Sequence, residues 1–241
     1  MEIPNSKSLE ITGPITLQAW VRPDQQILSN YFNFIISKQL NGTGYTLLTL
    51  GNANQKEFQF EANTQLHSGA SSGAAYVPID TWSQVTGVWN AGTEYMYVNG
   101  ILAATQADPL APVANTQPLS IGSSVFGSDT GWRGGISDIR IWNVALSQRQ
   151  IAASLKARLT GTEVGLVAYL PLNEGHGVTV LDASGNGNNG TLDPPDWRFD
   201  SSIPLNADLP SSNSIPEPGS WQLASIGAVF LSAILKRSIR S

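Results

Sequence analysis

Apolar and polar residues alternate in short runs along most of this chain, and turn-forming residues separate one run from the next. The runs lie at 15–21, 34–37, 45–50, 57–61, 82–89, 95–98, 119–121, 136–142 and 165–170. A period of two is typical of strands that bury one face, and regular spacing of short strands is typical of a sandwich. The pattern therefore predicts an all-β fold built as an antiparallel sandwich. Trp20, Trp82, Trp89 and Trp142 fall within these runs, so we expect them in the core.

Two local motifs predict a hairpin and a helix. Asn99 and Gly100 separate two apolar runs, and Asn-Gly favours a type I′ hairpin turn because both central residues need a positive φ. Ser147 followed three residues later by Gln150 matches a capping box, which predicts a short helix from Ser147 to about Leu159. The helix leaves the sheet directly after its closing strand.

Charged residues inside the strand patterns are expected on the solvent faces. Asp138 and Arg140 alternate with isoleucines, and Glu57 and Glu61 alternate with phenylalanines. Four residues at ~3.4 Å each separate the two glutamates by about 13 Å, whereas the carboxyl groups of glycosidases lie roughly 5 to 9.5 Å apart. The spacing argues against a catalytic pair.

Composition and charge narrow the range of functions. The chain has 241 residues, no cysteine and a formal net charge of -5. Lys236, Arg237 and Arg240 lie at its C-terminal end, so the rest of the chain is more acidic than the total suggests. A negatively charged surface repels phosphate backbones, so we expect no nucleic-acid partner. Without cysteine there are no disulfides and no thiolate metal sites.

The composition changes toward the C-terminus. Residues 194–214 are rich in Pro, Ser, Asp and Asn, which predicts an extended tether. The 15 residues at 221–235 carry no charge and precede Lys236 and Arg237, which favours a transmembrane helix, although ~22 Å of helix needs a locally thinned bilayer. We therefore predict a globular domain over 1–203, a flexible linker over 204–215 and a C-terminal segment over 216–241.

The globular part resembles the LamG-like, concanavalin A-like jelly-roll domains of bacterial surface proteins. The motifs that carry the resemblance are EIPNS at 2–6, TLQAWVRP at 16–23, WSQVTGV at 82–88, YVNG at 97–100 and GGISDIRIWNVALS at 134–147. The resemblance covers residues 2 to about 203 and implies an antiparallel jelly roll. The family usually has an F-D-G segment before EIPNS, where Met1 stands here, so we expect that an N-terminal edge strand is missing and that the true start lies upstream.

The C-terminal segment resembles the PEP-CTERM sorting signal. Pro216, Glu217 and Pro218 precede the apolar segment, and basic residues follow it. The resemblance implies that an exosortase-type membrane enzyme processes the tail of an exported protein. The protein would be anchored transiently in the membrane and then reach the cell envelope or extracellular matrix. Independently, the terminal basic residues favour the cytoplasmic side, which leaves the sandwich outside.

One loop offers a candidate ligand site. Trp132 lies in the sequence GSDTGWRGG before the closing strand, with Asp129 and Arg133 beside it. An exposed tryptophan between charged residues is suited to stacking on a sugar face. The alternative is a residue that packs on the rim of the sandwich, and we favour that alternative.

A second loop offers oxygen ligands for calcium. Asp182, Asn186 and Asn188 lie in a Gly-rich stretch, and calcium prefers oxygen ligands. The alternative, which we favour, is that these residues form Asx-turns and occupy left-handed positions. No other cofactor is indicated, because His67 and His176 have no acidic or His partner at ligand spacing.

Together these features predict an exported, non-catalytic module that binds glycan or protein. Two alternatives remain open. One is a glycoside hydrolase of the same fold class, and the other is a purely structural matrix protein without a ligand.

Overall fold

The computed structural model of the chain describes residues 1–24, 32–50, 57–63, 69–71, 78–123, 131–192 and 202–205. Its strands are β1 (Glu2–Ile3), β2 (Ile15–Pro23), β3 (Asn33–Ser37), β4 (Thr46–Leu50), β5 (Glu57–Glu61), β6 (Ala70–Ser71), β7 (Ser83–Asn90), β8 (Thr93–Val98), β9 (Ile101–Ala107), β10 (Leu119–Ile121), β11 (Gly134–Trp142), β12 (Leu166–Leu170), β13 (Thr179–Val180) and β14 (Gly190–Thr191). The helical segments described with them are the 3-10 helix η1 (Lys7–Leu9) and the α-helix α1 (Gln148–Ser154).

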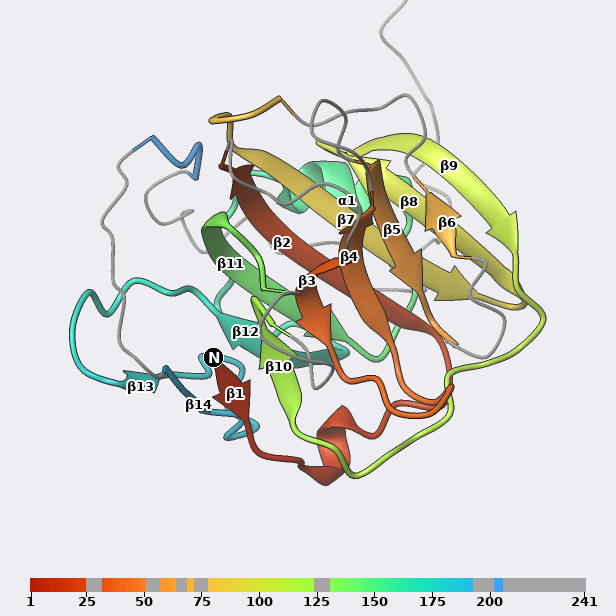
Figure 1. The fold of residues 1–241 in the computed structure, drawn as a ribbon, viewed down its shortest axis with the longest axis horizontal. Coiled ribbons are helices and arrows are strands. Elements are labelled where there is room, and N and C mark those ends of the chain that lie inside the picture. The colour runs from red at the N-terminus through yellow and green to blue at the C-terminus, as the bar shows by residue number, and fades with distance from the viewer. Residues whose placement is uncertain are drawn as a thin grey trace, which may run out of the picture.

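These strands form two sheets stacked face to face (Figure 1). Eight strands pair in the order β13-β14-β1-β10-β3-β4-β5-β6, and six pair in the order β12-β11-β2-β7-β8-β9. The pairings between these strands are antiparallel. In Figure 1, β3, β4 and β5 lie in front and α1 lies behind the six-stranded sheet. The predicted all-β antiparallel sandwich with a short helix is confirmed for the described residues.

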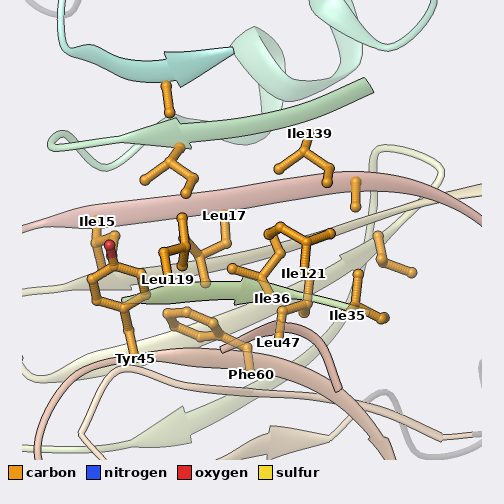
Figure 2. Close-up of a cluster of buried hydrophobic side chains, with 14 of the residues drawn as sticks. Ile15, Leu17, Ile35, Ile36, Tyr45, Leu47, Phe60, Leu119, Ile121 and Ile139 are labelled. Atoms are coloured by element: carbon orange, nitrogen blue, oxygen red, sulfur yellow. The ribbon is translucent and has the colours of Figure 1, made fainter. Parts of the chain in front are cut away.

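The core fills the space between the two sheets. Leu17 and Ile139 of the six-stranded sheet point toward Leu47 and Phe60 of the eight-stranded sheet (Figure 2), and all four side chains are fully buried. Gly87 on β7 lies against the ring of Phe60, and a Cβ at this position would overlap the ring. Because Gly87 has no side chain, the aromatic ring reaches the opposite sheet and the interior packs without a gap.

Three of the four tryptophans predicted in the core are buried. The exposed fraction is 2% for Trp20, 7% for Trp89 and 1% for Trp142, and Trp142 belongs to a second apolar cluster on the outer face of the six-stranded sheet. Trp82 is only half-buried, so its assignment to the core is wrong. Its ring lies against Gly135 of β11 and the guanidinium of Arg22 of β2 instead.

Both local motifs form the structures that they predict. Asn99 and Gly100 join β8 to β9 with φ values of 50° and 77°, which confirms the hairpin turn. At the start of α1, the Ser147 backbone N–H donates to Gln150 Oε1 at 2.9 Å, and the Ser147 side chain accepts from the Gln150 backbone N–H. The capping box is therefore complete.

The helix ends at Ser154, earlier than the predicted end near Leu159. Arg140 donates to the Ser154 carbonyl at 2.9 Å, and the indole N–H of Trp20 donates to the Leu155 carbonyl at 3.3 Å. The last carbonyls of a helix have no partner within the helix, so these two donors satisfy them and fix where the helix stops. Both side chains come from strands, and the residues near the helix end give no sign of them.

Asp138 and Arg140 lie inside the protein, so their assignment to the solvent face is wrong. Their exposed fractions are 1% and 0%. The guanidinium Nε and Nη2 atoms each donate to one oxygen of the Asp138 carboxylate at 2.7 Å. Arg140 also donates to the carbonyls of Ser154 and Ala157. Alternation of apolar and polar residues shows which residues share a face of a strand. It does not show that α1 covers the second face of β11.

In the ranges that the structure describes, no helix is both long enough and apolar enough to cross a membrane. The chain beyond residue 205 lies outside those ranges. Most of the predicted linker at 204–215 and all of the predicted segment at 216–241 are therefore outside the described residues, including the predicted transmembrane helix at 221–235.

Candidate functional site

Connections between strands of both sheets meet at one end of the sandwich. β2 ends and β11 begins there, because Pro23 lies opposite Gly134. β7 begins beside the end of β2, and Phe34 near the start of β3 forms a bridge with Gly131. We call this region the loop end and define it by the side chains of Arg22, Asp24, Phe32, Trp82, Trp132 and Arg133.

Trp132 is partly buried at the loop end and packs against the main core. Its ring centroid lies 6.4 Å from that of Phe58, and its indole N–H donates to the Gly135 carbonyl at 3.2 Å. Its backbone N–H donates to the Gly122 carbonyl at 2.8 Å. The indole N–H is thus already engaged, and the side chain offers its ring edge and face rather than a donor.

Arg133 follows Trp132 in the sequence and is exposed. Its carbonyl accepts from the backbone N–H of Asp24 at 3.1 Å, which ties the end of β2 to the start of β11. Asp129, the third residue of the predicted ligand site, lies outside the described residues. The structure therefore joins the backbone of Arg133 to Asp24, and the role of Asp129 remains a prediction.

Trp82 and Arg22 form the second feature of the loop end. The guanidinium carbon of Arg22 lies 5.8 Å from the centroid of the Trp82 ring, within the range of a cation–π contact. Gly135 lies against the same ring, because a Cβ there would come within 2.6 Å of Trp82 Cη2. Sequence reasoning missed this pair, although the two glycines that open β11 mark a place where a large side chain crosses the backbone.

Phe32 adds an exposed aromatic ring to the loop end. It is 49% exposed, and its ring centroid lies 6.2 Å from that of the buried Phe34. Aromatic rings with apolar faces and polar neighbours suit the binding of ligands that are themselves partly apolar, such as sugar rings. The loop end therefore includes aromatic rings from three connections, with the guanidinium of Arg22 over one of them.

The outer face of β5 carries a second group of polar side chains. Gln59 Nε2 donates to Glu61 Oε1 at 3.0 Å, and Ser71 Oγ donates to Glu57 Oε2 at 2.9 Å. Glu61 is only 3% exposed, so its assignment to the solvent face is wrong. Gly69 beside it has no side chain, which leaves room for the carboxyl group. Burial, helped by the charge of Asp108, raises the pKa of Glu61 to about 7.

The carboxylate of Asp182, one of the predicted calcium ligands, is fully used by donors of the protein. Oδ1 accepts from the backbone N–H groups of Tyr169 and Ser184, both at 2.9 Å. Oδ2 accepts from Ser184 Oγ at 2.8 Å and from the Asn188 backbone N–H at 2.9 Å. The bond from Ser184 to Asp182 closes an Asx-turn, the alternative role considered for this loop.

Asn186 and Asn188 close the free edge of β12. Their amide groups donate to the Val167 carbonyl at 3.0 and 2.8 Å, and Asn188 Oδ1 accepts from Ser6 Oγ at 2.6 Å. In the described ranges, no group of three or more His, Asp or Glu side chains is arranged to hold a metal ion. A calcium ion at this loop would have to compete with hydrogen bonds that already cap a sheet edge.

Comparison with known proteins places this geometry in context. The family model described as "Concanavalin A-like lectin/glucanases superfamily" matches residues 1–152. The structure of a proposed carbohydrate-binding protein from Bacteroides ovatus is similar with a TM-score of 0.60 and 19% identity, over 80% of this chain and 57% of that protein. A heptameric SAP-like pentraxin from Limulus polyphemus is similar with a TM-score of 0.50 and 17% identity, over 64% of this chain and 80% of that one. These likenesses show the fold alone. No curated protein sequence matches this chain.

Proposed function

The chain belongs to the concanavalin A-like lectin/glucanase superfamily, and from that premise we propose that its sandwich is a non-catalytic module that binds glycans at the loop end. The observation that carries the proposal is that Trp82 and Trp132 both contact Gly135, while Phe32, before β3, exposes a third aromatic ring. Aromatic rings stack on the apolar faces of sugars, and a few polar groups beside them fix the orientation of the ligand.

The polar groups of the loop end suit sugar hydroxyl or carboxylate oxygens. Arg22 lies over Trp82, so its guanidinium is held near the ring on which a sugar would stack. Arg133 is placed beside Trp132 by the bond between its own carbonyl and Asp24. The fold that this chain shares with a proposed carbohydrate-binding protein supports the same ligand class.

A glycan array with the full chain in detergent tests the proposal. We expect binding to a limited set of glycans and a loss of affinity of about tenfold or more in Trp82→Ala and in Phe32→Ala. The matched control is Val164→Ala, because Val164 is 54% exposed and lies just before β12, whose residue Leu166 pairs with the far end of β11. Unchanged affinity in both aromatic variants would contradict the site. Binding to matrix protein instead of glycan would favour a protein ligand, and no binding to either would favour a structural role.

A glycoside hydrolase is the second candidate, because one observation favours it. The pKa of Glu61 is raised to about 7, as a general acid requires, and Glu57 lies on the same face of the same strand. Against this, Glu61 is almost completely buried and Glu57 is bonded to Ser71. Release of reducing ends from the bound glycans, abolished in Glu61→Gln, would establish hydrolysis and refute the non-catalytic reading.

We further propose that the chain beyond the sandwich is a C-terminal sorting signal. In this proposal, 204–215 is a linker, 221–235 is a transmembrane helix, and an exosortase-type enzyme acts near Pro216, Glu217 and Pro218. The protein is then exported, held briefly in the membrane and released to the cell envelope or matrix. Mass spectrometry of the C-terminus from the native host tests this. An intact tail on exported protein, or normal processing of Glu217→Gln, would contradict it.

A further inference from the structure

Three carboxyl groups lie buried where β5 and β6 pack against β8 (Figure 1). The exposed fraction is 3% for Glu61, 1% for Glu94 and 2% for Asp108. In the described part of the chain, the charged groups on the elements packed around Glu94 are Glu57 and Glu61 of β5 and Asp108 after β9. The sequences of β6, β7 and β9 contain no charged residue, so the charges on these described elements around Glu94 are all of the same sign.

Glu94 joins the two ends of the connection between β5 and β6. Its Oε1 accepts from the Ala62 backbone N–H at 2.6 Å, and its Oε2 accepts from the Ala70 backbone N–H at 2.9 Å. Ala62 directly follows β5 and Ala70 opens β6. β6 itself is only two residues long and pairs with β5 through Ser71 and Ala70, so this carboxyl group supplies a large part of its attachment.

Glu94 is also hydrogen-bonded to Asp108. Asp108 is held in place by the Leu110 backbone N–H, which donates to its Oδ1 at 3.0 Å, and by its own N–H, which donates to the Gly92 carbonyl at 3.0 Å. A negative charge on Glu94 is therefore unfavourable in this dry interior, because burial removes its water and Asp108 beside it carries a charge of the same sign.

We propose that Glu94 is a proton-dependent bridge, which holds β6 to β5 while its buried carboxyl group is protonated and releases β6 when that proton is lost. Burial first, and then the neighbouring Asp108, raise the pKa of Glu94 to about 8, while the bonds from Ala62 and Ala70 act in the opposite direction. The release therefore belongs to mildly alkaline pH. The proposal concerns β6 alone and does not depend on whether the loop end binds a glycan.

Hydrogen exchange of the full chain labelled with 15N-alanine tests the bridge between pH 6 and pH 9. We compare protection factors of the Ala62 and Ala70 amides, which removes the intrinsic effect of pH on exchange. If opening lets Glu94 lose one proton, protection falls by up to about tenfold per pH unit as pH approaches the raised pKa of about 8 and levels off above it. The amides of Ala19 and Ala168, in the buried strands β2 and β12, should keep their protection.

Two variants separate the bridge from a general loss of stability. In Glu94→Gln the group cannot ionise, so the protection of Ala62 and Ala70 should stay constant from pH 6 to pH 9. In Asp108→Asn the neighbouring charge is gone but Glu94 stays buried, so the fall in protection should level off at a lower pH than in the wild type. Glu2→Gln, which removes an exposed carboxyl on β1, should behave like the wild type. If Glu94→Gln does not fold, Asp108→Asn carries the test. Flat protection in the wild type, an equal fall in Asp108→Asn, or a simultaneous fall at Ala19 would overturn the proposal.

Discussion

The sandwich buries charge in two places, and the two places neutralise it in opposite ways. Beneath α1, Asp138 faces Arg140 through two bonds of 2.7 Å, so each charge meets its opposite. Between the sheets, Glu94 lies beside Asp108, a group of the same charge, and burial together with this neighbour raises the pKa of Glu94 to about 8. The second arrangement therefore depends on pH.

The difference shows what each pair needs in order to stay buried. The ion pair needs both of its side chains, because removal of one leaves an uncompensated charge in the interior. The buried Glu94 needs its proton, and a change of pH can remove that proton while both side chains remain. Mutation is therefore the way to break the first pair, and pH is the way to break the second.

The largest effect is expected from Arg140→Leu. Asp138 is then buried without a partner, and the carbonyls of Ser154 and Ala157 lose their donor. We expect the free energy of unfolding in urea to fall by about 3–5 kcal/mol. The double variant Asp138→Asn/Arg140→Leu removes the unpaired charge and should recover part of the loss, since Asn tolerates the φ of 51° at position 138. A loss below about 1 kcal/mol in the single variant would show that solvent reaches Asp138.

An intermediate effect is expected from pH alone. The folded pKa values of Glu94 and Glu61 are raised to about 8 and about 7 from an ordinary value of 4.5. Their contribution to stability is therefore complete below about pH 4.5 and is lost as pH rises through 7 and 8. We expect the free energy of unfolding to fall by on the order of 2–3 kcal/mol between pH 5 and pH 9, measured by urea titration at each pH. A constant or rising stability over this range would contradict the burial of unpaired carboxyl groups.

The smallest effect is expected from Asp108→Asn, and its sign depends on pH. At pH 9 the substitution removes one of two adjacent charges, so the variant should be more stable than the wild type by about 1 kcal/mol. At pH 5 the two proteins should be nearly equal, because Asn keeps the acceptor that Leu110 uses. Equal destabilisation at both pH values would show that Asp108 matters only through its own hydrogen bonds. Thermal melts at the two pH values decide between these outcomes.

Features encoded by neighbouring residues could be predicted from the sequence. The Asn99–Gly100 turn and the Ser147–Gln150 capping box each involve residues at most three positions apart, and both form as expected. The end of α1 could not be predicted, because Arg140 and Trp20 fix it from 14 and 135 positions away. Local chemistry determines where an element starts, and tertiary contacts determine how far it continues.

The candidate site was predicted only in part, for a related reason. Trp132 stood out because it lies in a loop between charged residues, whereas Trp82 and Phe32 did not, since they border strand patterns. Glu61 was expected on the surface because alternation identifies the two faces of a strand but not what covers them. The proximity of Arg22 to Trp82 depends on the register of β2 with β7 and β11, which single-sequence patterns do not contain.

The first strand of the chain has a consequence for how the protein is made. Glu2 in β1 lies opposite Ser120 on one side and Thr191 on the other. During synthesis β1 is made before either of its two described neighbours, since β10 and then β14 follow it in the sequence. Pairings over such long sequence separations are slow to form, because a long stretch of chain must be ordered before they contribute. The ribosome therefore finishes nearly the whole sandwich before the eight-stranded sheet can close.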